Sequence, residues 1–328
     1  MHSEFDKSTT IRTLLAESGL QAILDTPGLT ELAINEPYVV LYDTGGDWQE
    51  KRLDMLSYDF LSELCQAFAV FNNLSVDEGI FSIKLPDGER GQVVMPPVTQ
   101  DGIISMTIRK PSLDRFDLAS YQSSGRFAFT QKSGEEKECD INSRLSELKA
   151  QGDIAGFFRL AVESNKNILL VGGTGSGKTT VMKAMVDCYP TSSRLITVED
   201  VHELSLPNHP NHVHLFYRKN TPVTPKLLIE SCMRMKPDHV LLAELRGDET
   251  WTYLELLNTG HAGSITTVHA NSSRDAYARI TSLIKQSPVG MGLEYEFINR
   301  TVKESIDVVA FFKRTHLTEL IFTAEEEV

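Results

Sequence analysis

Apolar residues in the second half of the chain recur as short runs, and the stretches between these runs have apolar positions at helical spacing. The runs occupy residues 167–171, 194–198, 212–217, 239–243, 264–268 and 306–312. Runs of this length that are rich in Val, Ile and Leu are typical of buried strands. Because strands and helices alternate from residue 153 onward, we predict a mostly parallel sheet with helices on its faces.

The first part of the chain has a different pattern. Residues 10–24 and 58–71 have the spacing of amphipathic helices. The segments 29–53 and 103–110 read as strands, and a Pro-Asp-Gly turn at 86–88 separates two more. This mixture predicts a small α+β domain.

A polar stretch, TQKSGEEKECDINSRLSELKAQGD, separates the two patterns. We therefore predict an α+β N-terminal domain over residues 1–128, a linker over 129–152 with a short helix near its end, and an α/β domain over 153–328. A second interpretation, in which the polar stretch is a surface loop within one larger domain, remains open at this point.

Charge and composition exclude several classes of protein. The net charge of the 328 residues is −13, and no dense block of Lys and Arg occurs, so we expect no stable binding to nucleic acid. No apolar run approaches the ~18–20 residues of a membrane span. The first residues carry acids where an export signal would carry bases, so we read no signal there. The cysteines are far apart, which argues against a zinc module or a disulfide framework: Cys65, Cys139, Cys188 and Cys232.

The segment NILLVGGTGSGKTTVMKAM contains a complete phosphate-binding pattern, Gly-x4-Gly-Lys-Thr, between an apolar strand and a helix. Glycines allow the backbone N–H groups to approach a phosphate, and the helix that follows directs its positive end at it. Lys178 is expected to reach the β- and γ-phosphates, and Thr179 to place its hydroxyl on Mg²⁺. The predicted nucleotide-binding residues are Gly172, Gly173, Thr174, Gly175, Ser176, Gly177, Lys178, Thr179 and Thr180.

The nucleotide is expected to be ATP, with Mg²⁺ as the second cofactor. A GTPase typically carries an Asn-Lys-x-Asp motif downstream of the phosphate loop, and this chain has none there. The nearest string, Asn165-Lys166-Asn167, precedes the loop and lacks the aspartate.

Acidic residues follow two of the predicted strands. Glu199 and Asp200 come directly after 194–198, and Glu244 comes directly after 239–243. Ligands of open α/β sheets bind beyond the carboxyl ends of the strands, where a carboxylate can hold Mg²⁺ or polarise the attacking water. We predict that Glu199 and Glu244 share these two roles. The alternative is that each acid caps the helix that follows it.

Two histidines flank the run in TGHAGSITTVHAN, residues 259–271. An extended run would hold His261 and His269 at opposite ends of one strand, so a single metal ion shared by both is not expected. His269, at the carboxyl end, is predicted to face the γ-phosphate and sense its presence. His261 is predicted to pack or hydrogen-bond near a subunit boundary.

Four blocks of the sequence, in order, resemble the secretion (traffic) ATPases of type II and type IV secretion and of type IV pili. The blocks are GGTGSGKTT (172–180), ITVEDVHEL (196–204), RMKPDHVLLAELRGDE (234–249) and TGHAGSITTVHAN (259–271). Weaker similarity extends to ELAINEP (31–37) and ISMTIRKPS (104–112). The chain most resembles the hexameric ATPases of type IV secretion and conjugation, through its compact N-terminal domain and its LLIESCMRMKPDHVLLAELRGDE block. It lacks the four-cysteine module common in the type II branch, which argues against that branch.

This resemblance implies a RecA-like P-loop domain in a ring of six subunits, with ATP between the two domains. It also implies arginines that reach the phosphates, for which Arg109 is the best match and Arg126 a weaker one. Arg234 is a further candidate for a phosphate or subunit contact. The implied partners are inner-membrane channel proteins and other secretion ATPases, with the ring in the cytoplasm, peripheral to the inner membrane.

Three other interpretations remain open from the sequence. A pilus assembly or retraction ATPase would share the same blocks. A slow nucleotide-gated assembly switch would bind ATP but turn it over too slowly for a motor. A DNA-translocating motor would bind DNA in a strongly salt-dependent way.

Overall fold

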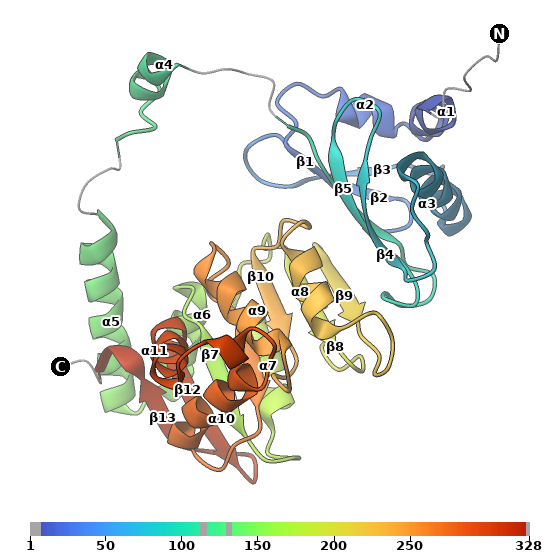
Figure 1. The fold of residues 1–328 in the computed structure, drawn as a ribbon. Helices are drawn as coiled ribbons and strands as arrows, with labels where there is room; N and C mark the ends of the chain where they lie inside the picture. Colours follow the sequence, from blue (N-terminus) through green and yellow to red (C-terminus); the bar gives the residue numbers. More distant parts are fainter. Residues whose placement is uncertain (1–7, 112–116, 129–132, 326–328) are drawn as a thin grey trace.

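The computed structural model describes residues 8–111, 117–128 and 133–325, and these form two separate sheets with their helices (Figure 1). We call residues 8–111 the N-terminal unit and residues 153–325 the C-terminal unit. The predicted fold class, a mostly parallel α/β sheet in the C-terminal part and a smaller α+β part before it, is confirmed. The exact domain boundaries stay a prediction.

The N-terminal unit is built on a six-stranded sheet whose neighbours all pair antiparallel, in the order β3-β2-β1-β6-β5-β4. Its apolar core lies between this sheet and three helices. The strands are β1 (Glu31–Glu36), β2 (Val39–Asp43), β3 (Gln49–Arg52), β4 (Ile80–Lys84), β5 (Arg90–Val94) and β6 (Ser105–Arg109). The helices are α1 (Ser8–Ser18), α2 (Leu20–Leu24) and α3 (Tyr58–Asn72).

Two helices lie between the units. α4 (Leu118–Ser123) stands apart from both sheets, and α5 (Ser133–Gln151) runs beside the C-terminal unit (Figure 1). The predicted linker, 129–152, is therefore mostly one helix rather than a polar segment with a short helix near its end, and its first part, 129–132, lies outside the described residues. α5 is helical because its buried Leu145 packs with the C-terminal core while the other described side chains are largely polar.

The C-terminal unit is a seven-stranded sheet in the order β13-β12-β7-β11-β10-β8-β9. All pairs are parallel except β12 with β13. The strands are β7 (Ile168–Gly172), β8 (Leu195–Glu199), β9 (His212–Phe216), β10 (His239–Leu242), β11 (Ile265–Val268), β12 (Val308–Lys313) and β13 (His316–Phe322). β13 had no counterpart in the predicted strands.

Helices cover both faces of this sheet, and each face has its own apolar core. The α-helices are α6 (Ile154–Glu163), α7 (Lys178–Val186), α8 (Pro225–Cys232), α9 (Glu249–Asn258), α10 (Ser273–Lys285) and α11 (Tyr295–Ser305). Two short 3₁₀ turns are η1 (Gly290–Gly292) and η2 (Thr323–Glu325). Within the described residues no helix is both long and apolar enough to cross a membrane.

The two units meet through buried polar groups. The guanidinium of Arg194 is fully buried and donates to Asn35 Oδ1 (2.9 Å) and to Thr107 Oγ1 (3.1 Å) across the boundary. Lys236 pairs with the buried carboxylate of Asp43. A buried charge is tolerated only where such donors and acceptors are matched, so these contacts fix how the units sit together.

Candidate functional site

The phosphate loop connects β7 to α7, as its motif predicts. Its glycines adopt backbone conformations that L side chains rarely take: φ is 153° at Gly172, 71° at Gly175 and 90° at Gly177. A Cβ at Gly172 would lie 2.4 Å from the carbonyl oxygen of Phe312 in β12. Strand β12 therefore presses directly on the loop, and only glycine fits at its first position.

The loop carries groups suited to a phosphate. Lys178 Nζ donates to the carbonyl oxygens of Gly172 (2.8 Å) and Gly173 (3.0 Å), so a cation is held inside the loop. Ser176 Oγ is buried without a hydrogen-bond partner. Gly173, Thr174 and Gly175 are exposed, which leaves the loop open to a ligand, and Thr180 is exposed beside them. An unmatched hydroxyl, a cation and open backbone N–H groups fit a nucleotide phosphate.

Glu244 follows β10 and lies in a chain of charged contacts. Its Oε1 is 3.3 Å from His269 Nε2, and its Oε2 is 2.7 Å from an Arg246 nitrogen. Arg246 also contacts Asp200 Oδ2 at 2.5 Å. The hydrogen bond with Glu244 and the one with Asp200 raise the pKa of Arg246, so this guanidinium stays charged.

His269 follows β11 and completes this group. Partial burial and the positive charge of Lys178 lower the pKa of His269, and the carboxylate of Glu244 acts in the opposite direction. Burial also lowers the pKa of Lys178, and Glu244 again opposes the shift. These mutual effects show that Lys178, Glu244 and His269 share one electrostatic environment at the carboxyl ends of β7, β10 and β11.

Glu199 is at the end of β8, yet the structure does not bring it to this group. Its side chain is 0% exposed, and Oε2 accepts from the backbone N–H groups of Glu203 (2.8 Å) and Leu204 (2.9 Å). Thr197 Oγ1 donates to Oε1 at 2.7 Å. Burial would raise the pKa of Glu199, but hydrogen bonds from His214, Thr197 and these backbone groups lower it. Its roles in catalysis and Mg²⁺ binding stay predictions.

The candidate arginines Arg109 and Arg234 lie elsewhere in the same chain. Both line a cavity of about 790 Å³ between the units, together with His261. His261 precedes β11 and His269 follows it, so this cavity is at the amino ends of the strands, away from the phosphate loop. Arg109 contacts Glu31 at 3.4 Å and is 77% exposed.

Arg126, the weaker candidate, follows α4. Its guanidinium carbon is 5.2 Å from the centre of the Tyr121 ring, and this segment stands apart from the C-terminal unit (Figure 1). The single chain therefore brings neither Arg109 nor Arg126 to the phosphate loop.

Arg246 is a site residue that the sequence reasoning missed. It joins Asp200 to Glu244 and connects the end of β8 to the end of β10. The sequence does place Arg246 two positions after Glu244, the acid that follows β10, and it places Asp200 directly after β8. Side chains at such spacing meet only because β8 and β10 are adjacent, and the order of strands in a parallel sheet is not written in the local sequence.

Comparison with known proteins identifies the family of this chain. The family model described as "Type II/IV secretion system protein" matches residues 138–312. The type IV secretion system protein VirB11 of Brucella abortus is 42% identical over 298 residues, covering 88% of this chain and 82% of that protein. VirB11 of Agrobacterium tumefaciens is 34% identical over 299 residues, covering 88% and 86%.

A solved structure agrees with these relatives. The VirB11 ATPase of the Brucella suis type IV secretion system, crystallised with sulphate, superimposes with a TM-score of 0.89 at 37% identity. The match covers 97% of this chain and 96% of that one. With the phosphate loop and the Glu244 group on the same fold, the chain belongs to the type II/IV secretion ATPase family and is an ATPase.

Proposed function

We propose that the chain hydrolyses ATP with Mg²⁺ as part of a six-membered ring that powers type IV secretion, in conjugative pilus assembly or substrate transfer. The observation that carries the proposal is the meeting of Lys178, Glu244 and His269 at the carboxyl ends of the strands, beside the phosphate loop. Transferring a phosphoryl group requires mainly positioning and charge stabilisation, and this group offers both.

Within the proposed site, each residue has a distinct role. Lys178 would leave the carbonyls of its own loop and bind the β- and γ-phosphates. Thr179 and Glu244 would hold Mg²⁺, which supplies neutralising charge at the phosphate oxygens when bound. Glu244 is also the best placed base for the attacking water, and His269, 3.3 Å from it, would register whether the γ-phosphate is present.

The position of the arginines supports a ring. Arginine stabilises the charge of the transferred phosphoryl group, but Arg109 and Arg234 lie at the amino ends of the strands, whereas Lys178 lies at the carboxyl ends. An arginine that reaches the phosphates would therefore come from a neighbouring copy of the chain. A closed ring gives every copy both a loop and a neighbour.

The partners in this proposal follow from similarity to the VirB11 protein of Brucella abortus, whose name places it in a type IV secretion system. We propose inner-membrane channel proteins and other secretion ATPases as partners, with the ring cytoplasmic and peripheral to the membrane.

Two measurements on the full chain test the proposal. Native mass spectrometry with ATP and Mg²⁺ should detect six subunits, and steady-state ATP hydrolysis should cease when EDTA removes Mg²⁺. A persistent monomer would contradict the ring, and hydrolysis that is unaffected by EDTA would contradict the metal dependence. Binding of ATP without multiple turnovers would favour a slow assembly switch instead.

A further inference from the structure

Three side chains at the end of β8 and on the neighbouring edge strand β9 form a cluster that the proposed mechanism does not use. They are Glu199, His202 and His214, and one oxygen or nitrogen from each lies within 4.8 Å of the other two. Oε1 of Glu199 is 3.5 Å from His214 Nδ1 and 3.9 Å from His202 Nδ1. Two imidazoles and one carboxylate around a common point are the ligand types of a transition-metal site.

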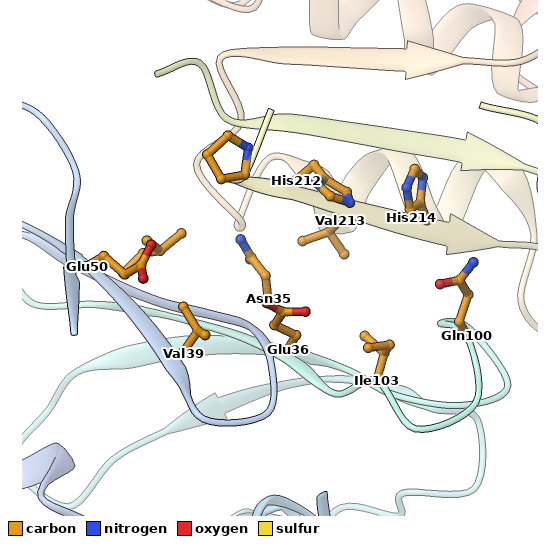
Figure 2. Close-up of a pocket in the computed structure, with 11 residues that line it drawn as sticks. Asn35, Glu36, Val39, Glu50, Gln100, Ile103, His212, Val213 and His214 are labelled. Carbon is orange, nitrogen blue, oxygen red and sulfur yellow. The ribbon is translucent and has the colours of Figure 1, made fainter. Parts of the chain in front are cut away.

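The parallel register explains why two of these groups share a face. β8 pairs with β9 so that Thr197 is opposite His214, and Glu199 is two residues further along. Alternate residues of a strand point to the same side. Figure 2 shows the result on β9, where His212 and His214 lie on one side of the strand and Val213 on the other. His202 reaches the same side from the loop that follows β8.

Hydrogen bonds hold the carboxylate in the orientation that a ligand needs. The backbone N–H groups of Glu203 and Leu204 occupy Oε2 of Glu199, while Oε1 accepts from the Thr197 hydroxyl and is the oxygen nearest the histidines. Thr197 Oγ1 is 2.7 Å from this Oε1 and 2.8 Å from His214 Nδ1. Because Thr197 donates its one proton to Oε1, its oxygen accepts from Nδ1–H of His214, and a metal ion bound at Nδ1 would take the place of that proton.

The histidines are also in a suitable position. The His202 side chain is 39% exposed and belongs to a loop, so it can move by the fraction of an ångström that coordination requires. His214 borders a cavity of about 290 Å³ between the units, opposite Asn35 and Gln100 (Figure 2).

The chemistry of the ligands selects the ion. Zinc binds imidazole nitrogen and carboxylate oxygen at about 2.0–2.2 Å, so two ligands of a tetrahedral site are about 3.3 Å apart. The 3.5 Å between Glu199 Oε1 and His214 Nδ1 is close to that separation. Mg²⁺ prefers an octahedron of oxygens, which this cluster does not offer.

We propose that Glu199, His202 and His214 bind a divalent transition-metal ion, zinc being the best fit, with water as the fourth ligand. The ion would tie the loop after β8 to the edge strand β9. That loop begins with Asp200, which contacts Arg246 and, through it, Glu244. A bound ion would thus restrain a segment that leads to the ATPase site. The metal site itself does not depend on the proposed hydrolysis.

The experiment titrates the tag-free full chain with zinc chloride in excess Mg²⁺ and without nucleotide. Calorimetry measures the affinity and the number of ions bound. We expect one zinc ion per chain. His202→Ala and His214→Asn should each weaken zinc binding at least tenfold, and Asn retains a hydrogen-bonding group beside Thr197. His316→Ala is the matched control because His316 is an exposed histidine on β13, at the other edge of the sheet, and should leave zinc affinity unchanged.

Cobalt provides a second measurement that does not depend on affinity or on hydrolysis. Co²⁺ in the same site should give the visible absorption of a four-coordinate ion, and His202→Ala should abolish it. Should His214→Asn fail to fold, as judged by circular dichroism, the His202→Ala variant alone tests the proposal, because His202 is exposed. Absence of zinc binding, or equal affinity in wild type and His202→Ala, would overturn the proposal. So would loss of binding in His269→Ala, which would place the ion at the Glu244 group.

Discussion

Glu244 and Glu199 occupy equivalent positions in the sequence, each at or just after the carboxyl end of a parallel strand, but their surroundings differ. Glu244 is 15% exposed and contacts the side chains of Arg246 and His269. Glu199 is fully buried; two backbone N–H groups donate to its Oε2, and the Thr197 hydroxyl donates to its Oε1. The strands β10 and β8 are direct neighbours, so two carboxylates only one strand apart have different surroundings.

The difference teaches that an acid at a strand end is not by itself a catalytic acid. A carboxylate that contacts only partly exposed side chains can exchange them for a metal ion or a water. A carboxylate with one oxygen that accepts from the backbone holds the fold of its own loop through that oxygen, and losing those bonds would leave buried donors unsatisfied. We therefore give Glu244 the direct role in hydrolysis, and Glu199 a role in positioning the loop from Asp200 to Leu204.

The largest expected effect is a loss of ATP hydrolysis when the phosphate loop is changed. Lys178→Ala should lower steady-state ATP hydrolysis by roughly 100-fold or more, because it removes a cation aimed at the transferred phosphate. Lys183→Ala, an exposed lysine on the same helix α7, is the matched control and should retain full activity. Wild-type turnover in a folded Lys178→Ala protein would contradict the whole site.

Replacing each acid by glutamine tests the comparison itself. Glu244→Gln should lower turnover roughly 100-fold while ATP affinity is retained, because the base and metal ligand are lost but the phosphate loop is not. Glu199→Gln should lower the free energy of unfolding by about 1–3 kcal/mol, since the amide cannot accept all the bonds of the carboxylate. Should Glu199→Gln leave stability intact but raise the Mg²⁺ concentration needed for turnover, Glu199 would hold the metal, as the sequence predicts.

Replacing His269, which contacts Glu244, should lower hydrolysis by a smaller factor. His269→Ala should lower hydrolysis roughly tenfold, about 1.4 kcal/mol of transition-state stabilisation, with ATP binding largely retained. Turnover and nucleotide affinity measured together separate the two effects. His261→Ala, at the other end of β11, should cost less turnover than His269→Ala; the reverse order would remove His269 from the site.

Replacing another acid, the buried Glu31, should give the smallest effect, and the pH dependence of its contribution to stability is opposite to that of Glu199. Burial raises the pKa of Glu31 to about 7, against the opposing charges of Arg109, Lys236 and Arg194. Because the folded state binds this proton more tightly than the unfolded state, the stability it contributes is present below about pH 4.5 and is lost as pH rises through 7. Glu31→Gln should stabilise the protein at pH 8 by about 1 kcal/mol and have little effect at pH 4.5.

Urea unfolding at the two pH values measures this difference. Glu199, whose pKa is lowered, should behave in the opposite way, with its contribution lost as pH falls below its folded pKa. An equal effect of Glu31→Gln at both pH values would show that burial does not control this carboxyl.

The sequence predicted the parallel sheet and the phosphate loop because both are encoded locally. A run such as 167–171 followed by a glycine-rich turn specifies its own conformation. β13 was missed because it is an edge strand whose residues are mostly half-exposed or exposed, so it lacks the continuous apolar run of the buried strands. The length of α5 was underestimated for a similar reason, since a mostly polar helix has little periodic signal.

The site was harder to predict than the fold because it depends on neighbours that are distant in sequence. The motif predicts Lys178 and Thr179, and the strand ends predict Glu244 and His269. Glu199 differs from them because its carboxylate accepts a hydrogen bond from the Glu203 N–H and contacts His214. These contacts follow from loop geometry and strand order. Local patterns place an acid at the edge of a sheet, but tertiary contacts decide what it can do there.

The contact of Gly172 with β12 sets a lower limit on how short a working version of this chain can be. The carbonyl oxygen of Phe312 lies where any side chain at Gly172 would have to be, so the last parallel strand shapes the first residue of the phosphate loop. A fragment cut after α11 would still contain every recognisable motif, yet it would lack the strand that braces the loop. Such a fragment would look complete in an alignment and fail as a nucleotide-binding protein.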